Sequence, residues 1–117
     1  MFAPETWALF RETRHRGALP GFDGEGWAGS RANGLYIRIQ VKVENAATIQ
    51  AKFETVGCLA TIATCEALLR WVLAEPGCAP TAGELDARLG GLPEARKFCL
   101  EMALHALQKA HEAARNQ

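Results

Sequence analysis

The sequence predicts an α+β protein in which a small antiparallel sheet of about three strands packs against helices. Residues 35–44 alternate strictly between apolar and polar side chains, and residues 48–56 repeat the alternation after a short turn. Such alternation is typical of strands with one buried face, which helices must then cover. After Gly57 the apolar residues recur every three or four positions, which indicates a long helix.

Length and composition favour one ordinary globular unit, and we expect residues 1–117 to form a single domain. The 13 basic and 13 acidic side chains cancel and are divided almost evenly between the two halves of the chain, which gives no support to nucleic-acid binding. The longest mostly apolar run, residues 58–74, contains Glu66 and Arg70. It falls short of the roughly 20 apolar residues that span a bilayer, so we expect no membrane span.

The cysteines are the residues with the most chemical potential. The N-terminus lacks the basic start and apolar core of a secretory signal, which predicts a cytoplasmic protein. In that reducing compartment the four cysteines are thiols, core residues or metal ligands rather than disulfides. Their spacings of 7, 13 and 21 residues match no zinc pattern.

The N-terminal third combines a helix, a loop and the first strands. Pro4 predicts the start of a short helix that ends before Gly17. Residues 17–34 contain six glycines and a proline, which predicts a loop with a short edge strand around residues 27–31. The face that we expect to be buried carries the apolar members of both long strands: Leu35, Ile37, Ile39, Val41, Val43, Ile49, Ala51 and Phe53.

Gly57 and Cys58 mark the junction between the last strand and the long helix. Gly57 permits a sharp turn there, and Cys58 falls at the helix N-terminus. Unpaired backbone N–H groups and the helix dipole favour a thiolate at that position. A buried apolar cysteine is the alternative interpretation. Cys65 lies on the apolar stripe of the helix and is expected in the core, whereas Cys78 follows in a loop without an expected chemical role.

Two further helices complete the chain. The sequence from Thr81 to Glu84 resembles a capping box and predicts a short helix that runs to about Leu89. Pro93 predicts the start of the last helix, whose apolar stripe begins near Cys99. Cys99 would face Cys58 if the two long helices pack with their N-terminal ends on the same side.

The stretches 53–58 and 92–99, each followed by a helix, together resemble the iron–sulfur cluster assembly scaffold family of the IscU and NifU N-terminal type. The resemblance covers nearly the whole chain, and it implies the same α+β fold. It also implies a scaffold that takes sulfur from a cysteine desulfurase, takes iron, and assembles a two-iron cluster. The cluster would then pass to recipient proteins with the help of chaperones.

The resemblance implies a metal site that is kept only in part. The family ligands are three cysteines and an aspartate, with a histidine directly before the third cysteine. Cys58 and Cys99 match the second and third cysteines. Asn33 stands at the first cysteine position, Leu35 at the aspartate position and Phe98 at the histidine position. The implied cargo is an iron–sulfur cluster or iron, with zinc as a surrogate.

These observations leave three hypotheses about function. In the first, a divergent scaffold binds iron or a cluster through Cys58 and Cys99, together with ligands from a partner, a second subunit or a small thiol. In the second, a binding module without metal contacts a desulfurase, chaperone or target. In the third, Cys58 or Cys99 carries a persulfide. The spacing of His15, His105 and His111 places none of them beside a cysteine, so we do not predict an enzyme.

Overall fold

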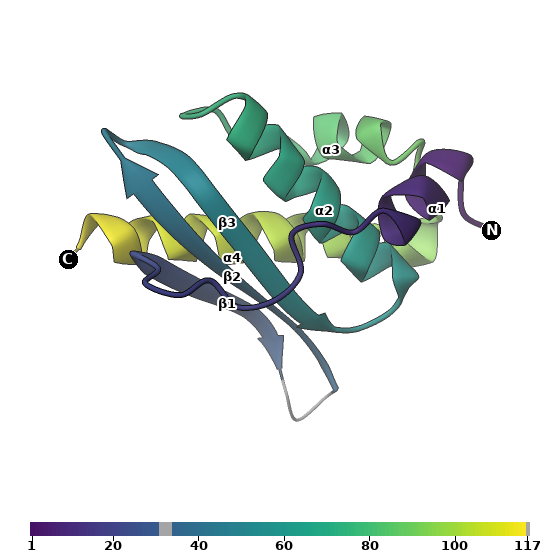
Figure 1. The fold of residues 1–117 in the computed structure, drawn as a ribbon. Coiled ribbons are helices and arrows are strands. Elements are labelled where there is room, and N and C mark those ends of the chain that lie inside the picture. The colour runs from purple at the N-terminus through teal and green to yellow at the C-terminus, as the bar shows by residue number, and fades with distance from the viewer. Residues whose placement is uncertain (31–33, 117) are drawn as a thin grey trace.

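The computed structural model describes residues 1–30 and 34–116, which form an α+β fold (Figure 1). The elements in chain order are α1 (Pro4–Arg11), β1 (Gly24–Ser30), β2 (Leu35–Glu44), β3 (Ala47–Val56), α2 (Leu59–Ala74), α3 (Ala82–Arg88), the 3₁₀ helix η2 (Glu94–Arg96) and α4 (Phe98–Arg115). Within the described ranges the strands form one antiparallel sheet in the order β1-β2-β3. The predicted fold class is confirmed. No helix among the described residues is long and apolar enough to cross a membrane.

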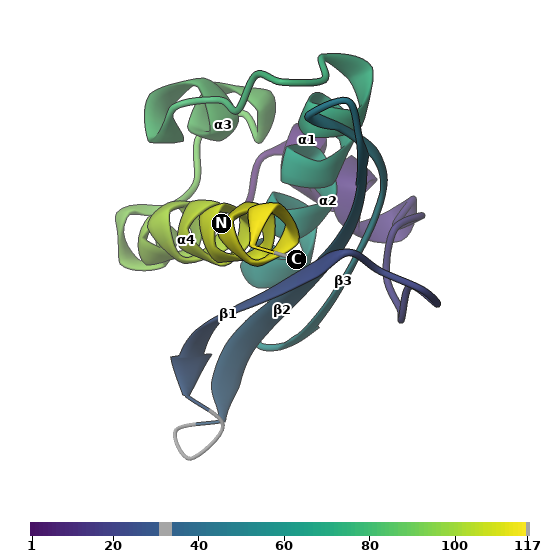
Figure 2. The same ribbon diagram turned by 90° about the vertical axis from the view of Figure 1, so that its left-hand side faces the viewer.

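The sheet is covered on one face by the two long helices. Figure 2 shows α4 and α2 on the same side of the curved sheet, with α1 and α3 farther out. The side chains of Ile37, Ile39 and Phe53 are fully buried beneath these helices. Burial of this apolar surface is the main favourable contribution to folding.

A β-bulge changes the expected alternation at the start of β3. Lys42 pairs with Gln50 but Val43 pairs with Thr48, so Ile49 is the extra residue on β3. Thr48 is therefore buried, whereas the side chain of Ile49 is 49% exposed. The prediction that Ile49 shares the buried face was wrong, because the two-residue period restarts at the bulge.

The outer face of the sheet is also partly covered, by the chain that leads from α1 to β1. Gly17 donates a backbone hydrogen bond to Phe53, and Phe53 donates one to His15. These bonds pair the segment with β3, which is an edge strand of the sheet. The backbone N–H of Leu19 donates to Oε1 of Gln40 at 2.8 Å. Gln40, expected to face solvent, is consequently buried.

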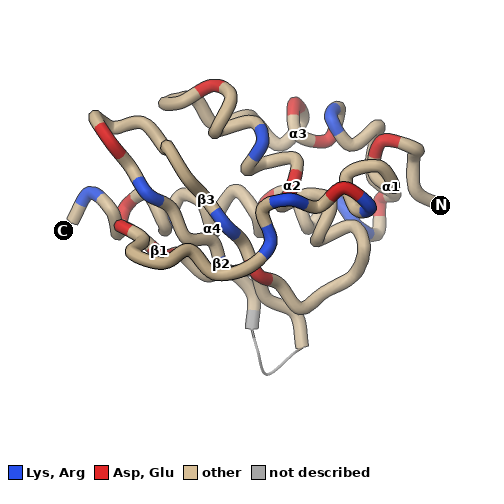
Figure 3. The backbone as a smooth tube through the Cα atoms, in the orientation of Figure 1, with Lys and Arg blue, Asp and Glu red and all other residues tan. Residues whose placement is uncertain are grey.

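A buried carboxylate on α2 holds the same segment in place. Glu66, a charged residue within the apolar run 58–74, is fully buried. Its oxygens accept the backbone N–H groups of Arg14 and His15, and they lie 2.7 Å from both His15 Nδ1 and Arg70 Nε. Burial alone would raise the pKa of Glu66, but these hydrogen bonds lower it below its usual value. Figure 3 shows the basic residues that follow one another along this segment beside α2.

The second half of the chain differs from its prediction at one helix start. Thr81 and Glu84 form the predicted capping box, in which each side chain accepts the other's backbone N–H. After Pro93, however, the backbone makes 3₁₀ bonds from Arg96 to Pro93 and from Lys97 to Glu94. The last α-helix therefore starts at Phe98 rather than at Pro93, which places Cys99 in its first turn.

Two glycines of β1 let α4 lie directly on the sheet. A Cβ atom at Gly24 would come within 2.0 Å of the Ala110 carbonyl oxygen, and one at Gly26 within 2.1 Å of the Ala106 carbonyl oxygen. Any larger residue would push the helix away from the strand.

We expect Gly26→Ala to lower the free energy of unfolding by about 3 kcal/mol, because the added methyl group overlaps the backbone of α4. Gly83→Ala is the matched control, since its Cβ would meet nothing closer than Thr81 Oγ1 at 3.9 Å. It should be neutral or stabilise by up to about 1 kcal/mol. Urea unfolding measures both, and similar effects of the two substitutions would contradict the packing argument.

Candidate thiol site at the N-terminal ends of α2 and α4

Cys58 occupies the N-cap position of α2, where the chain turns from β3 into the helix. Its backbone is extended, with φ −95° and ψ 179°, and its side chain is partly exposed. Gly57 leaves room for two neighbouring side chains at this turn, because a Cβ atom there would lie 2.8 Å from Thr61 Oγ1 and 2.9 Å from Leu35 Cδ1. The predicted junction, with its cysteine at the helix N-terminus, is confirmed.

Thr61 connects Cys58 to Cys99. Its buried Oγ1 lies 3.8 Å from Cys58 Sγ and 3.4 Å from Cys99 Sγ. The helices α2 and α4 thus begin side by side, and both sulfur atoms contact the same hydroxyl. Sequence reasoning missed Thr61, since its polar side chain lies off the apolar stripe. Its position three residues after Cys58, one helical turn along, is the signal that marks it.

The environments of the two thiols differ in their effect on ionisation. Burial would raise the pKa of Cys58, but hydrogen bonds from Thr61 and Ala60 and the charge of Arg96 lower it below its usual value. Burial and the neighbouring Cys58 raise the pKa of Cys99, against the effects of Thr61 and Arg96. Cys58 therefore ionises before Cys99. Arg96, on η2, is a second contributor that the sequence pattern did not single out.

The two remaining cysteines and two of the histidines have other surroundings, although Cys65 is near enough to Cys99 to interact with it electrostatically. Cys65 is fully buried in the core, as predicted, and burial raises its pKa. Cys78 is exposed in the loop after α2. His15 contacts Glu66, and His111 contacts Thr48. Across the described residues, no group of three or more His, Cys, Asp or Glu side chains is arranged to hold a metal ion.

The three substituted family positions add no metal ligand that the structure describes. Leu35 lies beside Gly57 and contributes a hydrocarbon side chain. Phe98 directly precedes Cys99, and its side chain is 43% exposed. Asn33 lies outside the described residues. In the described part of the site, the thiols of Cys58 and Cys99 are the groups able to hold iron or to accept sulfur.

Comparisons at the sequence level show the family to which this chain belongs. The chain matches the model of the NifU-like N terminal domain family over residues 2–116 and belongs to that family. It is 29% identical over 113 residues to the iron–sulfur cluster assembly scaffold protein IscU 1 of Archaeoglobus fulgidus, a match that covers 94% of this chain and 74% of the relative. It is 31% identical over 113 residues to the nitrogen fixation protein NifU of a Nostoc species, covering 87% of this chain and 38% of that longer protein.

Solved structures show the same architecture. A protein of Fervidobacterium islandicum assigned as an iron–sulfur cluster assembly scaffold for the SUF system superposes with a TM-score of 0.68 at 12% identity, covering 94% of this chain and 96% of that one. The N-terminal part of a NifU-like protein of Brucella abortus gives a TM-score of 0.54 at 17% identity, covering 96% and 83%. At these identities the likeness establishes the fold, and the family resemblance of the sequence is confirmed by the family match.

We expect Thr61→Val to raise the pKa of Cys58, because valine removes the hydroxyl that stabilises the thiolate. In a Cys78→Ser background, the pH profile of Cys58 alkylation should shift to higher pH. Thr61→Ser keeps the hydroxyl and should leave the profile in place. An unchanged profile in the valine variant would show that the hydroxyl has no such effect.

Proposed function

We propose that this protein acts in iron–sulfur cluster assembly as a scaffold that binds iron or a cluster through the thiolates of Cys58 and Cys99. The observation that supports this function is the approach of both sulfurs to the Thr61 hydroxyl. The relatives of this chain include proteins named as iron–sulfur cluster assembly scaffolds, which also supports the proposal. In this proposal residues 1–117 act as one cytoplasmic domain, and the protein is not an enzyme.

The ligand count implies a further source of ligands. A two-iron cluster is usually held by four cysteine thiolates, and this site supplies two. Leu35 and Phe98 cannot supply the remaining ligands, since their side chains carry no donor atom. The remaining ligands therefore come from outside this chain. They are supplied by a small thiol such as glutathione, by a second subunit, or by a partner protein, for which a cysteine desulfurase, a chaperone and a recipient protein are the candidates.

The difference in exposure gives an order of events. Cys58 is partly exposed, whereas Cys99 is fully buried. Incoming iron or sulfur therefore meets Cys58 first. Binding to Cys99 then requires loss of its proton, which a bound cation favours by attracting the negative thiolate. Zinc would bind the same thiolates as a surrogate for iron.

A second candidate function is that of a sulfur carrier. It is favoured by Cys58 itself, a partly exposed thiol with a lowered pKa at a helix N-terminus. Accepting a persulfide needs one such thiolate and no further ligand. A module that contacts assembly partners without carrying iron or sulfur is the remaining alternative.

Anaerobic incubation with ferrous iron, sulfide and glutathione tests the scaffold function. We expect the native protein and Cys78→Ser to retain iron and develop visible absorption, because Cys78 is exposed and remote from the thiol pair. Cys58→Ser and Cys99→Ser should each lose most of the bound iron. A native protein that stays colourless and free of iron, also with a cysteine desulfurase present, would refute this function.

Incubation with a cysteine desulfurase and cysteine, followed by alkylation and mass measurement, tests the carrier function separately. The carrier function predicts one added sulfur atom on Cys58, because its thiolate is the more accessible of the pair. Cys78→Ser is the matched control and should acquire the same modification. Sulfur found on Cys78 alone would indicate reaction with an exposed thiol and would exclude the carrier function.

A further inference from the structure

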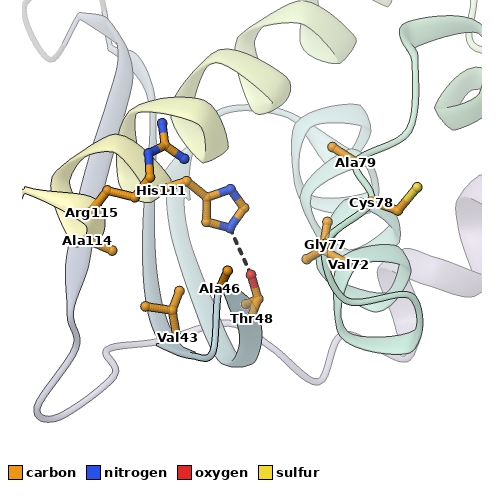
Figure 4. A pocket seen from close by; sticks show the side chains of 10 residues that line it. All are labelled: Val43, Ala46, Thr48, Val72, Gly77, Cys78, Ala79, His111, Ala114 and Arg115. Carbon is orange, nitrogen blue, oxygen red and sulfur yellow. Dashed lines mark hydrogen bonds between the residues drawn. The ribbon is translucent and has the colours of Figure 1, made fainter.

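A pocket opens near the C-terminal end of α4, far from the thiol site. Cys99 and His111 are twelve positions apart on that helix, a distance of about 18 Å at 1.5 Å per residue. The pocket has a volume of about 220 Å³ and lies between the β2–β3 turn, α2, the loop after α2, and α4 (Figure 4). A second pocket of about 340 Å³ adjoins it along α4, and His111 and Arg115 line both.

Small residues leave this space open. The walls include Ala46 from the turn, Gly77 and Ala79 from the loop, and Ala114 from α4. Val43 and Val72 add apolar surface, so most of the wall suits a hydrocarbon group.

The backbone departs from regular geometry on the strand side of the pocket. The bulge at Ile49 turns the Thr48 hydroxyl toward the pocket and leaves the isoleucine in solvent. Ala46 has a φ of 66°, in the left-handed region that residues with a Cβ atom usually avoid. The bulge and the turn at Ala46 both lie on the strand side of the pocket.

The polar groups in the pocket suit an anion. His111 Nε2 lies 2.8 Å from Thr48 Oγ1, and Figure 4 shows the imidazole reaching from α4 to β3. Burial and the charge of Arg115 lower the pKa of His111, so its ring is neutral at pH 7. Among the described residues, no carboxylate lines either pocket and none forms an ion pair with Arg115. The guanidinium is therefore available to a negatively charged ligand.

We propose that this pocket binds a small aliphatic carboxylate, with the carboxylate at Arg115 and His111 and the hydrocarbon chain against Val43 and Val72. A planar guanidinium matches the two oxygens of a carboxylate. The volume of about 220 Å³ lies below the roughly 300–1,000 Å³ of pockets for drug-sized ligands, which favours a short chain. The site is independent of the proposed role in cluster assembly.

Titration of the isotope-labelled full chain with sodium hexanoate, followed by NMR, tests the proposal. We expect saturable shifts at Thr48, Gly77, Ala79 and His111. Hexanol has the same hydrocarbon chain as hexanoate but no charge. Inorganic phosphate is charged but has no hydrocarbon chain. Each should bind at least about tenfold more weakly, the change expected from losing a charge-assisted hydrogen bond or an apolar contact.

Two charge substitutions on α4 sharpen this test. Arg115→Gln should weaken hexanoate binding about tenfold, since it removes the cation beside His111. Lys109→Gln removes an exposed cation of the same helix outside the pocket and should leave binding unchanged. Both positions are exposed, so both variants should keep the native spectrum. Equal binding of hexanol and hexanoate, or no effect of Arg115→Gln, would overturn the proposal.

Discussion

The direct contact between the backbones of β1 and α4 determines the layout of this protein. It is possible because Gly24 and Gly26 have no side chain on the face that meets the helix. With α4 fixed on the sheet, its first turn lies next to the first turn of α2. At the start of α2, Gly57 leaves room for the side chains of Thr61 and Leu35. The meeting of Cys58 and Cys99 is thus a consequence of backbone packing as well as of the cysteines themselves.

The two thiols differ in solvent exposure and in pKa. Cys58 has solvent access, helix N–H groups and Arg96 nearby, whereas Cys99 lies behind it in the core. Thr61 contacts both sulfurs and couples their environments. A site of this kind suits an incoming electrophile or metal that binds first to one sulfur and then to the other.

The sequence predicts this fold well where structure is decided locally. The β2 alternation, the Gly57–Cys58 junction and the Thr81 capping box are patterns within a few residues, and all are present. Gln40 and Glu66 are buried by a distant segment that no local pattern reveals. Likewise, the contribution of Thr61 to the site depends on how two helices meet, and Asn33 lies outside the described residues.

The central claim is that Cys58 and Cys99 form one site, and a reagent that needs two neighbouring thiols tests it directly. Phenylarsine oxide bonds stably to a pair of sulfurs within reach of one arsenic atom. We expect one arsenical per chain in a Cys78→Ser background, with both Cys58 and Cys99 protected from later alkylation. Absence of a stable adduct, or an adduct that leaves Cys99 open to alkylation in urea, would contradict the account.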